Sequence, residues 1–104
     1  MRRSNRPAPR YPVERDVELR FDGSNLRLFG ESRNLSATGM LIVSEDPKPP
    51  GTPIRFLCRD FRGRAEVIWW REGKGGALLG LRFTHLEERD REVLTKLLGR
   101  ARRF

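Results

Sequence analysis

The chain has 104 residues, of which 22 are Lys or Arg and 14 are Asp or Glu, so its net charge is +8. This length predicts one domain, and a hydrophobic content of 37% excludes a disordered tail. A single cysteine excludes a disulfide framework and a Cys-based zinc site. Apolar runs are too short for a membrane-spanning helix, and the basic start lacks the apolar stretch of a secretory signal, so we expect a cytoplasmic protein without membrane insertion.

Residues 1–12 combine arginine with proline, which predicts an extended arm rather than a helix. This arm contains no acidic residue and carries four arginines, namely Arg2, Arg3, Arg6 and Arg10. Arginine is the residue whose planar fork matches phosphate or a guanine edge. Composition alone leaves two interpretations open: a flexible basic leader, and an arm that becomes ordered when it binds an anion.

Residues 13–104 are expected to form a single domain. Period-two alternation predicts a strand from Val13 to Phe21 and further strands near residues 26–33, 40–43, 54–59, 64–71 and 79–83. We expect a bulge at Gly30 and a tight turn at Arg62-Gly63. Adjacent residues of a strand face opposite sides, so either Trp69 or Trp70 is expected in the core.

From Leu86 onward the apolar spacing becomes helical, which predicts a helix over residues 86–102. Thr84 and Glu87 are expected to cap its start, and its acidic residues, including Asp90, to be solvated. Six short strands and one helix predict a mainly β protein. The expected architecture is a six-stranded antiparallel β-barrel with a C-terminal α-helix and an extended N-terminal arm.

Residues typical of catalysis do not form a recognisable pattern. His85 is the sole histidine and has no partner at catalytic spacing, and Cys58 is expected to be a small buried hydrophobe. We find no nucleophile triad, phosphate-binding loop or metal-ligand spacing. The sequence therefore predicts a protein that is not an enzyme and needs neither a metal nor a cofactor.

Two polar motifs flank the predicted strands. The first is Arg6-Pro-Ala-Pro-Arg10, and the second is Asn34-Leu-Ser36-Ala-Thr-Gly39. Arg-x-x-x-Arg followed by Asn-x-Ser-x-x-Gly, in this order, resembles the signature of PilZ domains. The resemblance extends from Arg6 to Leu98 and includes a Trp-bearing fifth strand and a Gly-Leu-Arg-Phe sixth strand. From the residues alone, the second motif could also be a turn in which Asn and Ser hydrogen-bond to the backbone.

PilZ domains are bacterial receptors for the second messenger cyclic di-GMP, so the resemblance implies this ligand. It also implies that Arg6 and Arg10 clamp the ligand, that Asn34 and Ser36 contact a guanine edge, and that Gly39 permits close approach. Pro7 stands where many members carry another arginine. This departure leaves open whether one or two ligand molecules bind, and whether Arg2 or Arg3 takes part.

The leading hypothesis is a cyclic di-GMP-binding signalling receptor or adaptor. Ligand binding would change the arm and the nearby surface and thereby regulate an unidentified downstream protein. One alternative is a small basic β-barrel that binds single-stranded nucleic acid, which is less favoured because the aromatic residues do not cluster and the basic residues lie at the ends of the chain. Another is a PilZ fold that acts only as a protein-interaction module.

Overall fold

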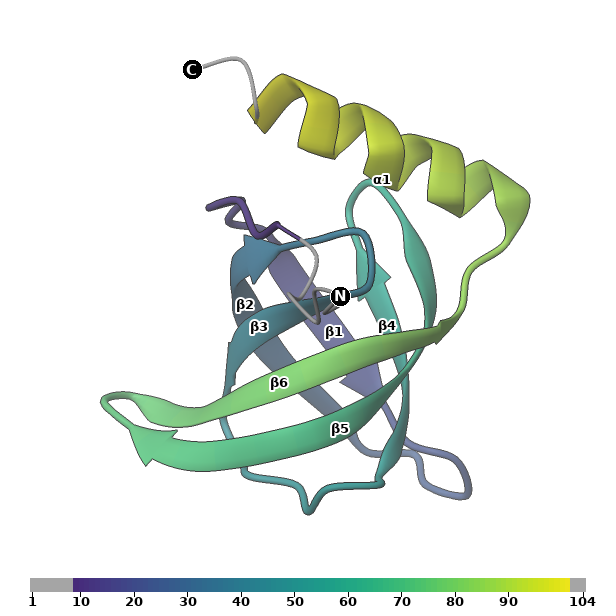
Figure 1. The fold of residues 1–104 in the computed structure, drawn as a ribbon. Helices are drawn as coiled ribbons and strands as arrows, with labels where there is room; N and C mark the ends of the chain where they lie inside the picture. The colour runs from purple at the N-terminus through teal and green to yellow at the C-terminus, as the bar shows by residue number, and fades with distance from the viewer. Residues whose placement is uncertain (1–8, 102–104) are drawn as a thin grey trace, which may run out of the picture.

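The computed structural model describes residues 9–101, which form a closed six-stranded barrel with a helix at one end (Figure 1). The strands are β1 (Asp16–Arg20), β2 (Arg27–Leu35), β3 (Gly39–Ser44), β4 (Pro53–Cys58), β5 (Arg62–Gly73) and β6 (Gly76–His85), and the helix is α1 (Glu88–Ala101). All neighbouring strands are antiparallel, in the order β1-β2-β3-β6-β5-β4. The mainly β architecture predicted from the sequence is confirmed.

The interior of the barrel is filled by the alternate residues of each strand. Leu19, Ile42, Phe56 and Leu79 are completely buried, although they come from four different strands. At one end of the barrel, α1 adds Leu94 and Leu97 to the same core (Figure 1). Burial of one face of every strand therefore fixes which side chains face outward.

Two backbone features differ from the sequence-based expectations. Gly30 pairs regularly with Val17 and Ser44, and the β2 bulge lies between Ser32 and Asn34 instead. The Arg62-Gly63 pair lies within β5. The turn comes before it, between Cys58 and Phe61, where the Cys58 N–H donates a hydrogen bond to the Phe61 carbonyl (2.8 Å). Both local predictions were wrong, because glycine in a strand can serve close packing as well as a bulge or a turn.

The start of the helix also differs from its prediction. Thr84 lies in β6, and α1 begins at Glu88, with the Glu87 carbonyl accepting the N–H of Arg91 (2.9 Å). Asp90 is only 3% exposed, although its neighbours on the helix predicted a solvated side chain. Tertiary contacts with β5, described below, explain its burial.

Neither tryptophan of β5 is in the core. Trp69 is 39% exposed and Trp70 is 40% exposed, so the prediction of one buried tryptophan was wrong. A bulge between Val67 and Trp69 interrupts the alternation that the prediction assumed. Beyond this bulge, β5 and β6 continue as a hairpin that projects away from the barrel (Figure 1).

Candidate ligand-binding face

The structure brings the two polar motifs together. Arg10 Nη1 donates a hydrogen bond to Asn34 Oδ1 (2.9 Å), although the two residues are 24 positions apart. Beside this contact, Tyr11 and Leu35 exchange backbone hydrogen bonds of 2.9 Å in both directions. The last residues of the arm thus pair with the end of β2, and this pairing places the Arg10 guanidinium at the second motif.

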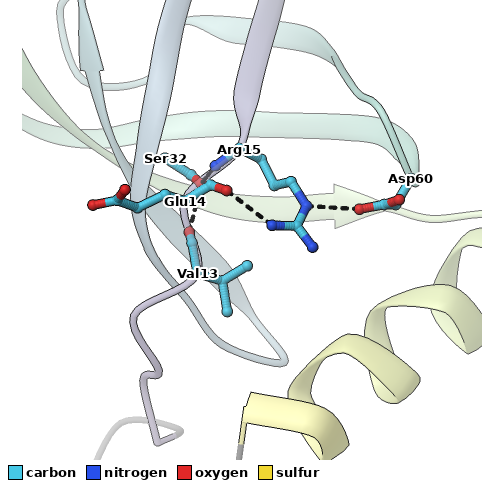
Figure 2. Close-up of polar contacts among 5 residues, drawn as sticks. All are labelled: Val13, Glu14, Arg15, Ser32 and Asp60. Atoms are coloured by element: carbon cyan, nitrogen blue, oxygen red, sulfur yellow. Dashed lines mark hydrogen bonds and ion pairs between the residues drawn. The ribbon is translucent and has the colours of Figure 1, made fainter.

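Hydrogen bonds hold the residues just before β1 in place, as Figure 2 shows. Ser32, which is buried, donates its hydroxyl to the Val13 carbonyl (2.7 Å) and accepts the N–H of Arg15 (2.8 Å). On the other side, Arg15 Nε donates to Asp60 Oδ2 in the turn between β4 and β5 (2.7 Å). These bonds tie the residues just after the arm to both β2 and the β4–β5 turn.

Ser36 is fully buried, and its side chain shapes the turn after β2. Its Oγ accepts the N–H groups of Thr38 and Gly39, each at 3.1 Å. This is the turn geometry that the residues alone had left open. Asn34, by contrast, is partly exposed and presents its amide on the outer surface.

Close packing between β3 and β6 requires glycine at position 39. A side chain at this position would collide with the Leu81 carbonyl of β6. The backbone angle φ of Gly39 is not positive. Among the described residues, positive φ angles occur at Gly23, Gly51, Gly75 and Gly76. Gly39 therefore lets β3 and β6 approach closely beside the turn that Ser36 holds.

The first arginine of the motif, Arg6, lies outside the described residues, as do Arg2 and Arg3.

A further residue joins this face through the strand register. Asn34 pairs with Leu41, Leu41 with Gly80, and Gly80 with Trp69, so the four positions form one line across β2, β3, β6 and β5. The indole of Trp69 lies directly over Gly80, where a Cβ atom would collide with it. Sequence reasoning missed this position because the bulge before Trp69 is not visible in the alternation. The one signal was glycine at position 80 in an otherwise apolar strand.

The resulting surface has groups that are suited to a nucleotide ligand. Arg10 supplies a planar cation, Asn34 an amide, Leu41 an apolar side chain, and Trp69 an aromatic ring. The Arg71 guanidinium lies over this ring, 5.9 Å from its centre. Guanidinium groups match phosphate and guanine acceptors, and indole rings stack on bases.

One hollow in the described surface is less suited to an anion. A hollow of about 530 Å³ near the start of β1 is lined by Arg15, Arg59 and four carboxylates, those of Glu14, Asp16, Glu31 and Asp60. Within residues 9–101 no three His, Cys, Asp or Glu residues gather closely enough to hold a metal ion. The one described helix is not long and apolar enough to cross a membrane.

Three solved structures share this fold at 18% sequence identity each. The Bacillus subtilis inhibitor of motility (MotI/DgrA) has a TM-score of 0.78 over 98% of this chain, which spans only 53% of that protein. The PilZ domain of Escherichia coli YcgR, solved with cyclic di-GMP, has a TM-score of 0.74. The match covers 96% of this chain and 93% of the YcgR domain. The PilZ domain of CeSA from a cellulose-synthesizing bacterium has a TM-score of 0.68, covering 88% of this chain and 96% of its own.

A comparison with curated protein sequences finds no match. The model of the PilZ domain family, however, matches residues 2–100, almost the entire chain. Together with the barrel, the helix at its end and the two adjoining motifs, this match shows that the chain belongs to the PilZ domain family.

Proposed function

We propose that this protein is a receptor for cyclic di-GMP that regulates a partner protein in the cytoplasm and performs no chemistry itself. The observation that carries the proposal is the hydrogen bond between Arg10 and Asn34, which joins the two motifs on one outer face. Family membership supports the same ligand, since the related YcgR domain was solved with cyclic di-GMP.

The ligand offers groups that fit this face. Each guanine of cyclic di-GMP presents O6 and N7 as paired acceptors, and each phosphate carries a negative charge. Arg10 would bind one of these groups with its fork, and Arg6, four residues earlier in the arm, would bind another. Asn34 would contact a guanine edge, while Ser36 and Gly39 hold the turn and the strand that position it. The exposed indole of Trp69 would stack on a guanine from the opposite end of the line.

Ligand binding would also change the hydrogen bond between Arg10 and Asn34. The Arg10 guanidinium donates to Asn34, so engaging a phosphate or guanine means exchanging that bond for one to the ligand. Because Tyr11 anchors the chain immediately after Arg10, this exchange would change the conformation of the arm rather than that of the barrel. A partner protein that recognises the arm in one of its two positions would then sense the ligand through a shift in population.

Calorimetric titration with cyclic di-GMP on the intact protein and on Arg10→Ala tests this proposal. The substitution removes charge-assisted hydrogen bonds worth about 1.5–3 kcal/mol, so we expect binding to weaken roughly 10- to 150-fold. Lys96→Ala, which removes one positive charge from the exposed surface of α1, is the matched control and should bind as the intact protein does. The titration midpoint gives the number of ligand molecules.

Two outcomes would contradict the proposal. One is a folded intact protein that binds no cyclic di-GMP, which would favour a PilZ fold that acts only as an interaction module. The other is an Arg10→Ala variant that binds as tightly as the intact protein. A thermal melt of each variant separates loss of the site from loss of the fold.

A further inference from the structure

The outer surface of the barrel carries a line of arginines that the ligand-binding face does not use. Arg27 pairs with Arg20, Arg20 with Arg55, and Arg55 with Arg64. Four arginines thus lie directly beside one another across β2, β1, β4 and β5. Neighbouring strands are roughly 4.8 Å apart. Like charges opposite each other destabilise a sheet, so this arrangement is unfavourable for the fold alone.

The next line of outward residues adds a fifth arginine and two apolar side chains. Phe29 pairs with Glu18, Glu18 with Leu57, and Leu57 with Arg62. Phe29 is 56% exposed, the largest exposure among the large hydrophobic side chains described. We call these two adjoining lines the arginine face, which consists of Arg20, Arg27, Arg55, Arg62, Arg64, Glu18, Phe29 and Leu57.

Carboxylates within the described chain compensate only part of this charge. Arg20 contacts Glu18 (2.5 Å) and Arg55 contacts Asp22 (3.5 Å). Among residues 9–101, the side chains of Arg27, Arg62 and Arg64 form no ion pair, and all three are exposed. A hollow of about 490 Å³ lies along the same surface. Four arginines (Arg20, Arg55, Arg62 and Arg64) line it, and Glu87 and Asp90 line it near the start of α1.

This surface is separate from the ligand-binding face. In the closed barrel the arginine face is centred on β1 and β4, whereas the line from Asn34 to Trp69 is centred on β3 and β6. These two pairs of strands lie on opposite sides of the barrel (Figure 1). A molecule bound to one face leaves the other accessible.

We propose that the arginine face is a docking surface for an acidic segment of a partner protein, anchored by an apolar side chain against Phe29. Three guanidinium groups that form no ion pair among residues 9–101 provide the positive charge that carboxylates complement, and each can bind a carboxylate with two parallel hydrogen bonds. Arginine and aromatic residues are the types that dominate the binding energy of protein interfaces. A protein is favoured over a nucleic acid because Phe29 and Leu57 lie among the arginines and suit an apolar side chain of a peptide segment.

Fluorescence anisotropy with a short fluorescein-labelled peptide that repeats Glu-Glu-Leu tests the proposal. The comparison probes are peptides that repeat Gln-Gln-Leu and Glu-Glu-Ser, and an oligo-dT strand with the same number of charges. The test variant is Arg27→Glu/Arg64→Glu, and the matched control is Arg91→Glu/Lys96→Glu, which changes the net charge equally on the exposed surface of α1. A melt confirms that each variant is folded.

We expect the Glu-Glu-Leu peptide to bind more tightly than the three other probes. Its affinity should fall about tenfold or more in the arginine-face variant and less than about threefold in the α1 variant. Phe29→Ser should weaken the Glu-Glu-Leu peptide and leave Glu-Glu-Ser unchanged. Titration of the arginine-face variant with cyclic di-GMP should match the intact protein, so failure of this proposal is distinguishable from failure of the proposed ligand.

Three results would overturn the proposal. An intact protein that does not bind the Glu-Glu-Leu peptide saturably has no such docking surface. Equal losses in the two double variants would show that only net charge matters. Tighter binding of oligo-dT than of the peptide, lost in the arginine-face variant, would assign the surface to nucleic acid instead.

Discussion

At the scale of single residues, Ser36 and Gly39 support the candidate ligand-binding face from beneath. The Ser36 hydroxyl is fully buried and accepts two backbone N–H groups, and Gly39 leaves space for the Leu81 carbonyl. Asn34 and Arg10, in contrast, meet on the outside. The same short motif therefore combines residues that give the turn its shape with a residue that a ligand can reach.

Cys58 provides a prediction at this scale. Burial, together with the nearby carboxylate of Asp60, raises its pKa from 9.0 to about 12, and the Arg15 guanidinium offsets only part of this rise. This rise in pKa lowers the thiolate fraction at neutral pH about a thousandfold. We expect iodoacetamide to alkylate native Cys58 far more slowly than the urea-unfolded chain, as measured by mass spectrometry at mildly alkaline pH.

The same shift has a consequence for stability. Between about pH 9 and pH 12 the unfolded chain loses the thiol proton while the native protein keeps it, so the free energy of unfolding should fall as the pH rises through this range. Cys58 is the only cysteine, so Cys58→Ala removes both the alkylation and this part of the pH dependence. Equal alkylation rates in the native and unfolded chains would contradict the assigned pKa.

At the scale of elements, Asp90 attaches α1 to the barrel. Its Oδ1 accepts the backbone N–H of Arg62 at the start of β5 (3.1 Å) and a side-chain N–H of Arg89 (3.2 Å). Leu94 and Leu97 extend the same attachment as buried apolar contacts farther along the helix. Asp90 therefore fixes the N-terminal end of α1 against the edge of the arginine face.

Removing this acceptor should loosen the helix. Asp90→Ala leaves the Arg62 N–H without its partner, so we expect the free energy of unfolding to decrease by about 1–3 kcal/mol in urea titrations. Asp90→Asn retains an acceptor oxygen and should lose less. Glu92→Ala, on the exposed side of the same helix, should change stability by less than about 0.5 kcal/mol. Similar losses for Asp90→Ala and Glu92→Ala would show that the contact with β5 contributes nothing.

At the scale of the whole molecule, a net charge of +8 attracts any polyanion, so affinity by itself does not identify the ligand. Salt dependence separates a compact dinucleotide from a nucleic-acid strand, because a strand releases many counterions when it binds. Between about 50 and 200 mM salt, a strand that neutralises several arginines should weaken by two or more orders of magnitude. Cyclic di-GMP, with two phosphates, should weaken less than about tenfold in the same calorimetric series. A steeper loss would favour the nucleic-acid hypothesis.

Alternation of apolar and polar residues determined most of the fold. It gave the strand positions and the change to helical spacing after Leu86, because burial of one face per strand requires that period. The motifs containing Arg10 and Asn34 can also be recognised in the sequence from the spacing of their residues. Their contact cannot be read from the sequence, since it depends on the pairing of Tyr11 with Leu35 at the end of β2.

Pairing between strands that are distant in the sequence sets the features that no local pattern predicts. The bulge before Trp69 turns that side chain onto the same line as Asn34, and a local pattern carries no record of a bulge. Likewise, Arg20, Arg27, Arg55 and Arg64 are ordinary polar positions in their own strands. They become one continuous charged surface only because the register of the closed barrel aligns them.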